Sequence, residues 1–267
     1  MSAINRVGER LSAVEDDIFG WTLEKISAVK PCLRQGDLIV FSDYEDETKR
    51  CAIVVTADCD LEQKKHANLV TLVPVVSEKT ILERYLLPDD CNSKIDHIVK
   101  FALKEYKIDE KLDHLVQVEL LIEALSSDAK SDPIALLMAE IISDDLREVS
   151  IEGYKDLLKR VKLHAKKASS LADQIAKRGD LMILPDAQVL GVDARIAWVR
   201  HVWQAPASSI ALKTSDTSAR RGERIARLSS PFRYRLTQIM AQVFSDIGLP
   251  DVPLDLKKSV METFGDA

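Results

Sequence analysis

Three closely spaced apolar runs constrain the fold of this chain more than any other feature of its sequence. They cover residues 36–41, 51–56 and 69–76, and an acidic turn at 42–47 separates the first two. Short apolar runs that end at Gly, Pro, Asp or Asn are typical of buried β-strands. Because proline cannot donate a ladder hydrogen bond, Pro74 in the third run predicts an edge position or a bulge. The sequence therefore predicts three strands that begin a small antiparallel sheet.

The middle of the chain, from 77 to 177, has a helical pattern instead. Its apolar residues recur at three- and four-residue steps, the spacing of amphipathic helices. One predicted helix has Asp132 as its N-cap and Pro133 at its first helical position. No strand is expected here, so this stretch is interpreted as a helical insertion. The five expected helices cover residues 80–87, 94–106, 111–125, 133–146 and 151–175.

Strand patterns return after the insertion, at 181–184, at 194–203 and in a short run at 210–212. Ser230 and the proline after it then open an amphipathic helix that is expected to reach about residue 247. The sheet is therefore expected to be built from two separate parts of the chain.

The N-terminal part also has helical spacing. Apolar residues recur at three- and four-residue steps from 3 to 26, and Gly20 is expected to bend or divide that helix. The expected fold is α+β: a small antiparallel β-barrel with a helical insertion domain and a C-terminal helix. Its expected parts are an N-terminal helical segment at 1–30, the first half of the barrel at 31–77, the insertion at 78–178, and the second half with the C-terminal helix at 179–267.

Composition excludes several classes of protein. Hydrophobic residues make up 46% of the chain and charged residues 30%, with nine glycines and nine prolines, as in ordinary globular domains. There is no long uninterrupted apolar run and no basic region followed by one, so a cytoplasmic protein without a membrane span is expected. Four cysteines without a CxxC pair predict free thiols. No Walker loop, GxGxxG, HExxH or GxSxG motif is present, and neither a metal nor another cofactor is predicted.

Charge is unevenly distributed along the chain. The net charge is −6, yet the stretch 155–178 carries eight basic residues against Asp156 and Asp173. A second basic segment precedes and enters the terminal helix. Arginines pair well with phosphates, which predicts a nucleic-acid-binding surface; the alternative is ion pairing with acidic groups of the same chain or of a partner protein. The arginines of the second segment are Arg220, Arg221, Arg224, Arg227, Arg233 and Arg235.

The turn between the second and third predicted strands is the other candidate site. It contains Asp58, Cys59 and Asp60, and His66 follows in the same loop. These side chains could line a site, hold a metal or supply a thiol nucleophile with a histidine base. The alternative is that the aspartates form the turn through side-chain bonds to the backbone.

The strand sequences resemble those of the PemK/MazF toxin family, small SH3-like barrels that cleave RNA in bacterial toxin–antitoxin systems. The run 36–40 is similar to that family's "GDI/LVxV" strand, 50–56 to its "RPAVVLS" strand and 69–76 to its "xVxVVPIT" strand. The stretch 181–210 is similar to its later strands, and 224–229 to its "RIGRLSP" helix opening. The resemblance covers somewhat less than half of the chain. It implies an SH3-like barrel interrupted by the insertion.

The resemblance also implies a site and a function. The family's arginine before the second strand falls on Arg50, and its threonine at the end of the third strand falls on Val76, with Ser77 adjacent. Arg50 and Ser77 are thereby implied as the residues of a metal-independent endoribonuclease in a bacterial stress or phage-defence system. The alternative for Arg50 is a solvated charge at the entry of the strand.

A second hypothesis belongs to another functional class. Valine cannot donate a proton or accept a hydrogen bond, so Val76 favours a non-catalytic adaptor that kept the barrel. Such an adaptor would bind a partner protein through the barrel and the insertion. RNA, a partner protein and a second copy of the chain are therefore the candidate partners, with no membrane among them.

Overall fold

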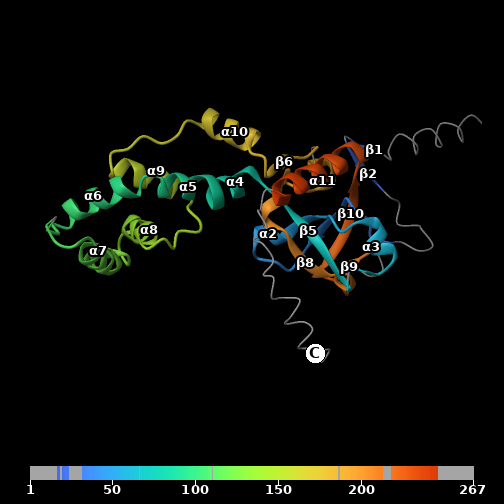
Figure 1. The fold of residues 1–267 in the computed structure, drawn as a ribbon, viewed down its shortest axis with the longest axis horizontal. Helices are drawn as coiled ribbons and strands as arrows, with labels where there is room; N and C mark the ends of the chain where they lie inside the picture. Colours follow the sequence, from blue (N-terminus) through green and yellow to red (C-terminus); the bar gives the residue numbers. More distant parts are fainter. Residues whose placement is uncertain are drawn as a thin grey trace, which may run out of the picture.

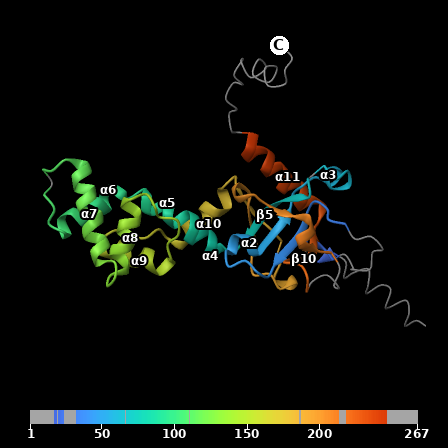
Figure 2. The same ribbon diagram turned by 90° about the horizontal axis from the view of Figure 1, so that it is seen from below.

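The computed structural model shows an α+β protein, as predicted. It describes residues 17–18, 20–23, 32–65, 67–109, 111–185, 187–212 and 218–245. Figure 1 shows two parts: a body of β-strands covered by the last helix, and an arm of helices beside it. Figure 2 shows the same separation from below. Within the described ranges, every helix is too short or too polar to span a lipid bilayer.

The strands of the described residues form one sheet. They are β1 (Asp17–Ile18), β2 (Trp21–Thr22), β3 (Asp37–Phe41), β4 (Cys51–Val54), β5 (Leu69–Val76), β6 (Leu181–Ile183), β7 (Ile196–Trp198), β8 (Trp203–Pro206), β9 (Ile210–Ala211) and β10 (Gly222–Leu228). Their order is β1-β2-β10-β3-β4-β5-β7-β6, while β8 also pairs with β5 and β9 with β10. All pairs are antiparallel except β9 with β10.

The helices fall into two groups. Those of the body are α2 (Glu47–Arg50), α3 (Asp58–Glu62), the short η2 (Gln188–Leu190), η3 (Val199–His201) and η4 (Ala207–Ser209), and α11 (Ser230–Ser245). Those of the arm are α4 (Glu78–Ile81), the π-helical η1 (Leu82–Leu86), α5 (Leu87–Asn92), α6 (Ile95–Glu105), α7 (His114–Asp128), α8 (Pro133–Ile142), α9 (Ile151–Arg160) and α10 (Ala168–Lys177). Asp132 caps α8 as predicted, because its carboxylate accepts from the amides of the next two non-proline residues.

The three predicted strands of the first half are confirmed as β3, β4 and β5. Leu38 pairs with Ile53, which pairs with Val73, and these side chains pack with those of α11. The alternate residues, including Ile39, pack on the opposite face with Trp203. Because both faces of the strands are buried, the sequence shows continuous apolar runs rather than alternation.

Pro74 lies inside β5 and not at a sheet edge. Val55 donates to the carbonyl of Thr71 at 2.9 Å, so the alternation of the antiparallel ladder turns the Pro74 nitrogen away from β4. On that other side the partner of β5 changes, from β8 along residues 69–72 to β7 along 75–76. The missing N–H group therefore falls where one neighbouring strand ends and the next begins.

Several further predictions are wrong in the described residues. The N-terminal helix is replaced around Gly20 by the hairpin of β1 and β2, whereas residues 3–16 lie outside the described part of the chain. The expected strand 194–203 is divided into β7, η3 and the start of β8. No strand was expected from the residue pattern at 222–228, yet β10 occupies the middle of the sheet.

Another wrong prediction is the long helix 151–175, which is broken between α9 and α10. Lys162 has a φ of +59°, a left-handed conformation that ends a helix. The chain then turns so that Nζ of Lys166 lies 2.9 Å from a carboxylate oxygen of Asp90 in α5. This contact joins residues far apart in the sequence, so the helical period alone could not predict the break.

The arm has a hydrophobic core of its own, formed by α5 to α9 and separate from the two clusters that cover the sheet. Among its most buried side chains are Leu87, Ile98, Leu121, Leu125 and Met138. A smaller cluster, which includes Val76, Ile81, Ile175 and Trp198, joins the arm to the body. The insertion is therefore a packed helical unit attached at the end of β5.

Asp90 is the charged centre of this arm, and its replacement by asparagine should lower the stability of the arm. The side chain is 2% exposed, and its carboxylate binds Lys94, Lys166 and the Tyr154 hydroxyl. Burial alone would raise the pKa of Asp90, but these three partners bring it below the ordinary value of 3.8. Asp90→Asn should therefore lower the free energy of unfolding at pH 7 by about 2–4 kcal/mol.

The contribution of the Asp90 charge to stability should depend on pH, and this dependence is the control for the variant. Because the folded pKa lies below the unfolded one, the stabilisation by Asp90 is present above about pH 4 and is lost as the pH falls below it. Urea unfolding followed by helical circular dichroism should show a difference between wild type and Asp90→Asn that shrinks on acidification. An equal difference at pH 7 and pH 3 would contradict the assigned role of the charge.

Candidate functional site

A cleft of about 610 Å³ lies where the body meets the start of the arm. Its walls come from β3, α2, the start of β4, the end of β5, α4 and the loop 191–194. Arg50 and Ser77, the two residues implied by the resemblance, both line it. Val76 lines it as well, although its side chain is only 2% exposed. The fold thus brings the implied site residues together.

Arg50 is the last residue of α2 and is held by the turn before that helix. Its Nε donates to the carbonyl of Tyr44 at 3.0 Å, and its Nη2 donates to the carbonyl of Glu45 at 3.1 Å. The remaining terminal nitrogen, Nη1, lies 4.0 Å from Oε1 of Glu47, one helical turn earlier. The side chain is 55% exposed, so the guanidinium is oriented and also accessible from the cleft.

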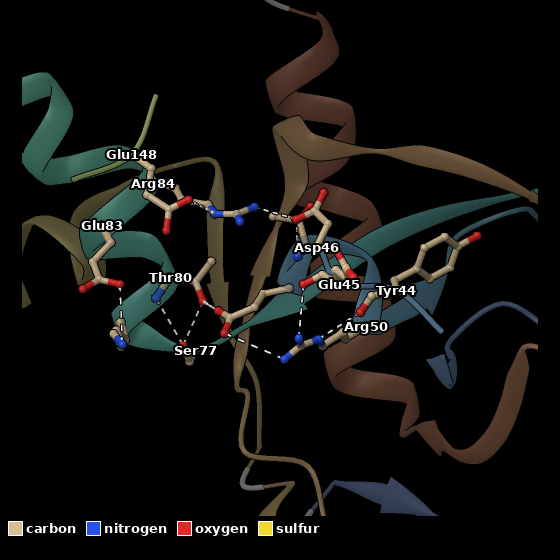
Figure 3. A network of polar contacts seen from close by, with 12 residues as sticks. Tyr44, Glu45, Asp46, Arg50, Ser77, Thr80, Glu83, Arg84 and Glu148 are labelled. Carbon is tan, nitrogen blue, oxygen red and sulfur yellow. Dashed lines mark hydrogen bonds and ion pairs between the residues drawn. The ribbon is translucent and has the colours of Figure 1, made fainter. Parts of the chain in front are cut away.

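A chain of hydroxyl groups links Ser77 through Thr80 to Glu47. Figure 3 shows Ser77 beside Thr80. The hydroxyl of Thr80 lies 2.6 Å from Oε2 of Glu47 and 2.9 Å from the hydroxyl of Ser77. A carboxylate can only accept, so Thr80 donates to Glu47 and accepts from Ser77. Ser77 also accepts from the Thr80 amide as the N-cap of α4. Both hydroxyl groups are therefore used to fix the Glu47 carboxylate.

Neither Glu47 nor Thr80 was selected from the sequence. Glu47 lies in the acidic turn before the second strand, three residues ahead of Arg50, and α2 places the two side chains on one face. The i,i+3 spacing of Glu47 and Arg50 would indicate that their side chains are neighbours, but only if a helical turn is expected at these residues. The contact of Glu47 with Thr80 spans 33 positions and needs the tertiary structure.

The same helix α2 connects the cleft to the arm. Asp46 caps α2 by accepting from the Thr48 amide, and it also pairs with Arg84 of η1. Figure 3 shows Arg84 between Asp46 and Glu148. Burial alone would raise the pKa of Asp46, but its bonds with Arg84 and Thr48 lower it. The cleft is thus built on a helix that is ion-paired to the arm.

Charges of both signs surround the cleft. Glu78 and Asp193 add carboxylates to that of Glu47, while Lys79 adds an ammonium group that is 70% exposed. Glu78 is ion-paired with Arg195, and this bond and a backbone amide lower its pKa against the opposing effect of burial. A phosphate in the cleft would therefore be held by individual cations and not by a uniformly positive wall.

The Asp58–Asp60 turn lies at a different place and forms the helix α3. Oδ1 of Asp58 accepts from the Gln35 amide at 2.7 Å, which ties the loop to the start of β3. Cys59 is exposed, with its sulfur 3.8 Å from Oδ1 of Asp60. Asp58 lines a separate cavity of about 210 Å³ that shares no residue with the cleft.

The metal alternative for this loop finds no support among the described residues. They contain no group of three or more His, Cys, Asp or Glu side chains placed to hold an ion. His66, the fourth candidate, lies outside them. The bond from Asp58 to the Gln35 backbone fits the turn-forming alternative.

The six arginines of the basic segment separate into two groups. Arg224 and Arg227 belong to β10 and are 8% exposed, and both lie against the buried carboxylate of Asp37. They stabilise the pairing of β10 with β3. The other four arginines have different partners. Arg220 donates to the Ser208 carbonyl, and Arg221 lies 3.9 Å from Asp43. Arg233 donates to the Gln35 carbonyl, and Arg235 donates to Gln238. A nucleic-acid surface would rest on these four.

The cleft is the place where the residues implied by the resemblance meet, and its side chains define what it could do chemically. It combines a carboxylate held by hydroxyl groups with an oriented, accessible guanidinium. Comparison of the chain with protein-family models, with curated proteins and with solved structures finds no match.

Proposed function

We propose that this chain cleaves RNA in the cleft, on a body that is an interrupted SH3-like barrel. The observation that carries the proposal is the pairing of Arg50 with Glu47, whose side chains are 55% and 52% exposed. An acid–base group and a fixed cation are the two elements that RNA cleavage by the substrate's own 2′-hydroxyl requires. The ends of the strand sequences that resemble the RNA-cleaving family line part of this cleft, through Val40, Arg50, Cys51, Val75 and Val76.

In the proposed reaction, the 2′-hydroxyl attacks phosphorus while Glu47 accepts its proton. The bond from phosphorus to the 5′-oxygen breaks, and that oxygen takes a proton from water because the cleft is open to solvent. One product ends in a 2′,3′-cyclic phosphate and the other in a 5′-hydroxyl. Arg50 stabilises the negative charge that grows on the phosphate oxygens.

Ser77 has a positioning role in this scheme. Its hydroxyl donates to Thr80 and caps α4, so it orients Glu47 through Thr80 and does not touch the phosphate. Because Glu47 and Arg50 are the groups that act on the RNA in this scheme, the reaction uses no hydroxyl group at position 76, where this chain has Val76. The site departs from the family pattern at that position without losing its carboxylate or its guanidinium.

The proposal is tested by Glu47→Gln, which keeps the shape of the side chain but cannot accept the proton. Purified protein in excess over a labelled RNA of mixed sequence, with EDTA present, should cleave it, and the variant should be slower by about 10²–10⁴-fold. Glu223→Gln, an exposed glutamate of β10, is the matched control and should cleave at the wild-type rate. Equal rates for wild type and Glu47→Gln would refute the role of Glu47.

The adaptor hypothesis is a second candidate, which the anchoring of Arg50 favours. The two bonds of Arg50 to backbone carbonyls hold the turn before α2 whether or not a phosphate is bound. An adaptor would bind a partner protein through the body and the arm. It would leave the RNA intact in the same assay, in wild type and variant alike.

A further inference from the structure

The outer face of α7 exposes large apolar side chains to solvent. Leu115 is 72% exposed, and Val116 and Leu120 are each 41% exposed, as is Leu112 just before the helix. The opposite face of α7 already contributes Leu121 and Leu125 to the core of the arm. The helix is therefore apolar on both sides, a composition typical of a helix that is covered on both.

Acidic residues are interleaved with this apolar face. Residues three and four apart are neighbours on a helix, so Glu119 and Glu123 lie on the same face as Val116 and Leu120. Both glutamates are exposed, and α7 contains neither lysine nor arginine. The face therefore offers apolar contact and negative charge together.

The charge decides which kind of partner fits. In a symmetric pair of two copies, the same patch meets itself, which would bring the α7 glutamates of one copy close to those of the other. Like charges that face each other across an interface are unfavourable, whereas basic side chains would be attracted. An acidic and apolar helix face matches an amphipathic helix whose apolar stripe is flanked by lysines or arginines.

The position of α7 supports the same conclusion. Figure 1 shows it at the end of the arm, away from the sheet, and Figure 2 shows it in the same outlying place. The cleft and α7 share no residue, so a partner could bind there independently of the cleft. We propose that the outer face of α7 docks a basic amphipathic helix of a partner protein.

The test uses the full chain and two synthetic peptides of about 18 residues, long enough for five helical turns. Both carry the same leucine stripe, flanked by lysines in one and by glutamates in the other. Fluorescence anisotropy should show the lysine peptide binding at least about tenfold more tightly, with a difference that shrinks at high salt. The double variant Glu119→Lys, Glu123→Lys should reverse this preference.

A second pair of variants tests the apolar contact. Leu115→Ser with Leu120→Ser should weaken binding of the lysine peptide by about tenfold or more. Leu69→Ser, at a leucine of the body that is 40% exposed, should leave it unchanged. Equal binding of the two peptides, or binding unaffected by the α7 variants, would overturn the proposal. So would a dimer in sedimentation equilibrium that the Leu115 and Leu120 changes dissociate.

Discussion

Replacing Arg50 with alanine should lower the rate of RNA cleavage by about 10²–10³-fold, the loss that follows removal of one fixed donor to a developing oxyanion. The guanidinium is held by two backbone carbonyls and lies on the exposed side of the cleft, beside Glu47. Its contribution is therefore to the transition state, and the effect should appear in kcat. Single-turnover cleavage of a labelled RNA measures it.

Two further variants show whether the guanidinium itself is responsible. Arg50→Lys keeps the charge but cannot make the same set of directed bonds, so it should recover only part of the rate. Arg147→Ala removes an exposed arginine of the arm and should cleave as wild type does. If Arg50→Ala cleaves as fast as wild type, the cleft is not the site of the reaction.

Replacing Asp37 with asparagine should lower the free energy of unfolding of the body by about 3–5 kcal/mol, because it leaves buried guanidinium groups without their counter-charge. Asp37 is fully buried at the start of β3. Its carboxylate accepts from Nε of Arg227 at 2.8 Å and from the Arg34 amide at 2.8 Å, and Nη1 of Arg224 lies 3.8 Å away. Urea unfolding at pH 7 measures the loss.

Asp43→Asn is the matched control for this prediction. Asp43 lies 3.9 Å from Arg221, and both side chains are more than half exposed. A surface pair of this kind contributes between zero and about 1 kcal/mol. A loss below about 1 kcal/mol for Asp37→Asn as well would mean that β10 does not depend on this carboxylate.

The ion pairs of Asp37 with Arg224 and Arg227 explain why the sequence pattern does not predict the strand β10. β3, β4 and β5 are apolar on both faces, and that pattern is readable from the sequence alone. β10 carries Arg224 and Arg227 at buried positions, and arginines in a sequence are expected at the surface. Their partner Asp37 is about 190 positions away, so only the fold shows that they are internal.

The candidate site was predictable to a similar extent. The resemblance of two strand sequences placed Arg50 and Ser77 in one site, and the cleft does contain both. The carboxylate could not be selected, because Glu47 becomes part of the site through a helical turn of only four residues and a bond to Thr80 of α4. The break between α9 and α10 could not be predicted either, because it depends on a contact between residues distant in the sequence, Lys166 and Asp90.

In the proposed reaction, the cleft uses the 2′-hydroxyl of RNA as the nucleophile. The most direct measurement incubates the wild-type protein, with EDTA present, with a single-stranded RNA and with the DNA of the same sequence, and identifies the product ends by mass spectrometry. We expect the RNA to be cut to 2′,3′-cyclic phosphate and 5′-hydroxyl ends while the DNA stays intact. Cleavage of both strands, RNA products with 3′-hydroxyl ends, or no cleavage of either strand would contradict the claim.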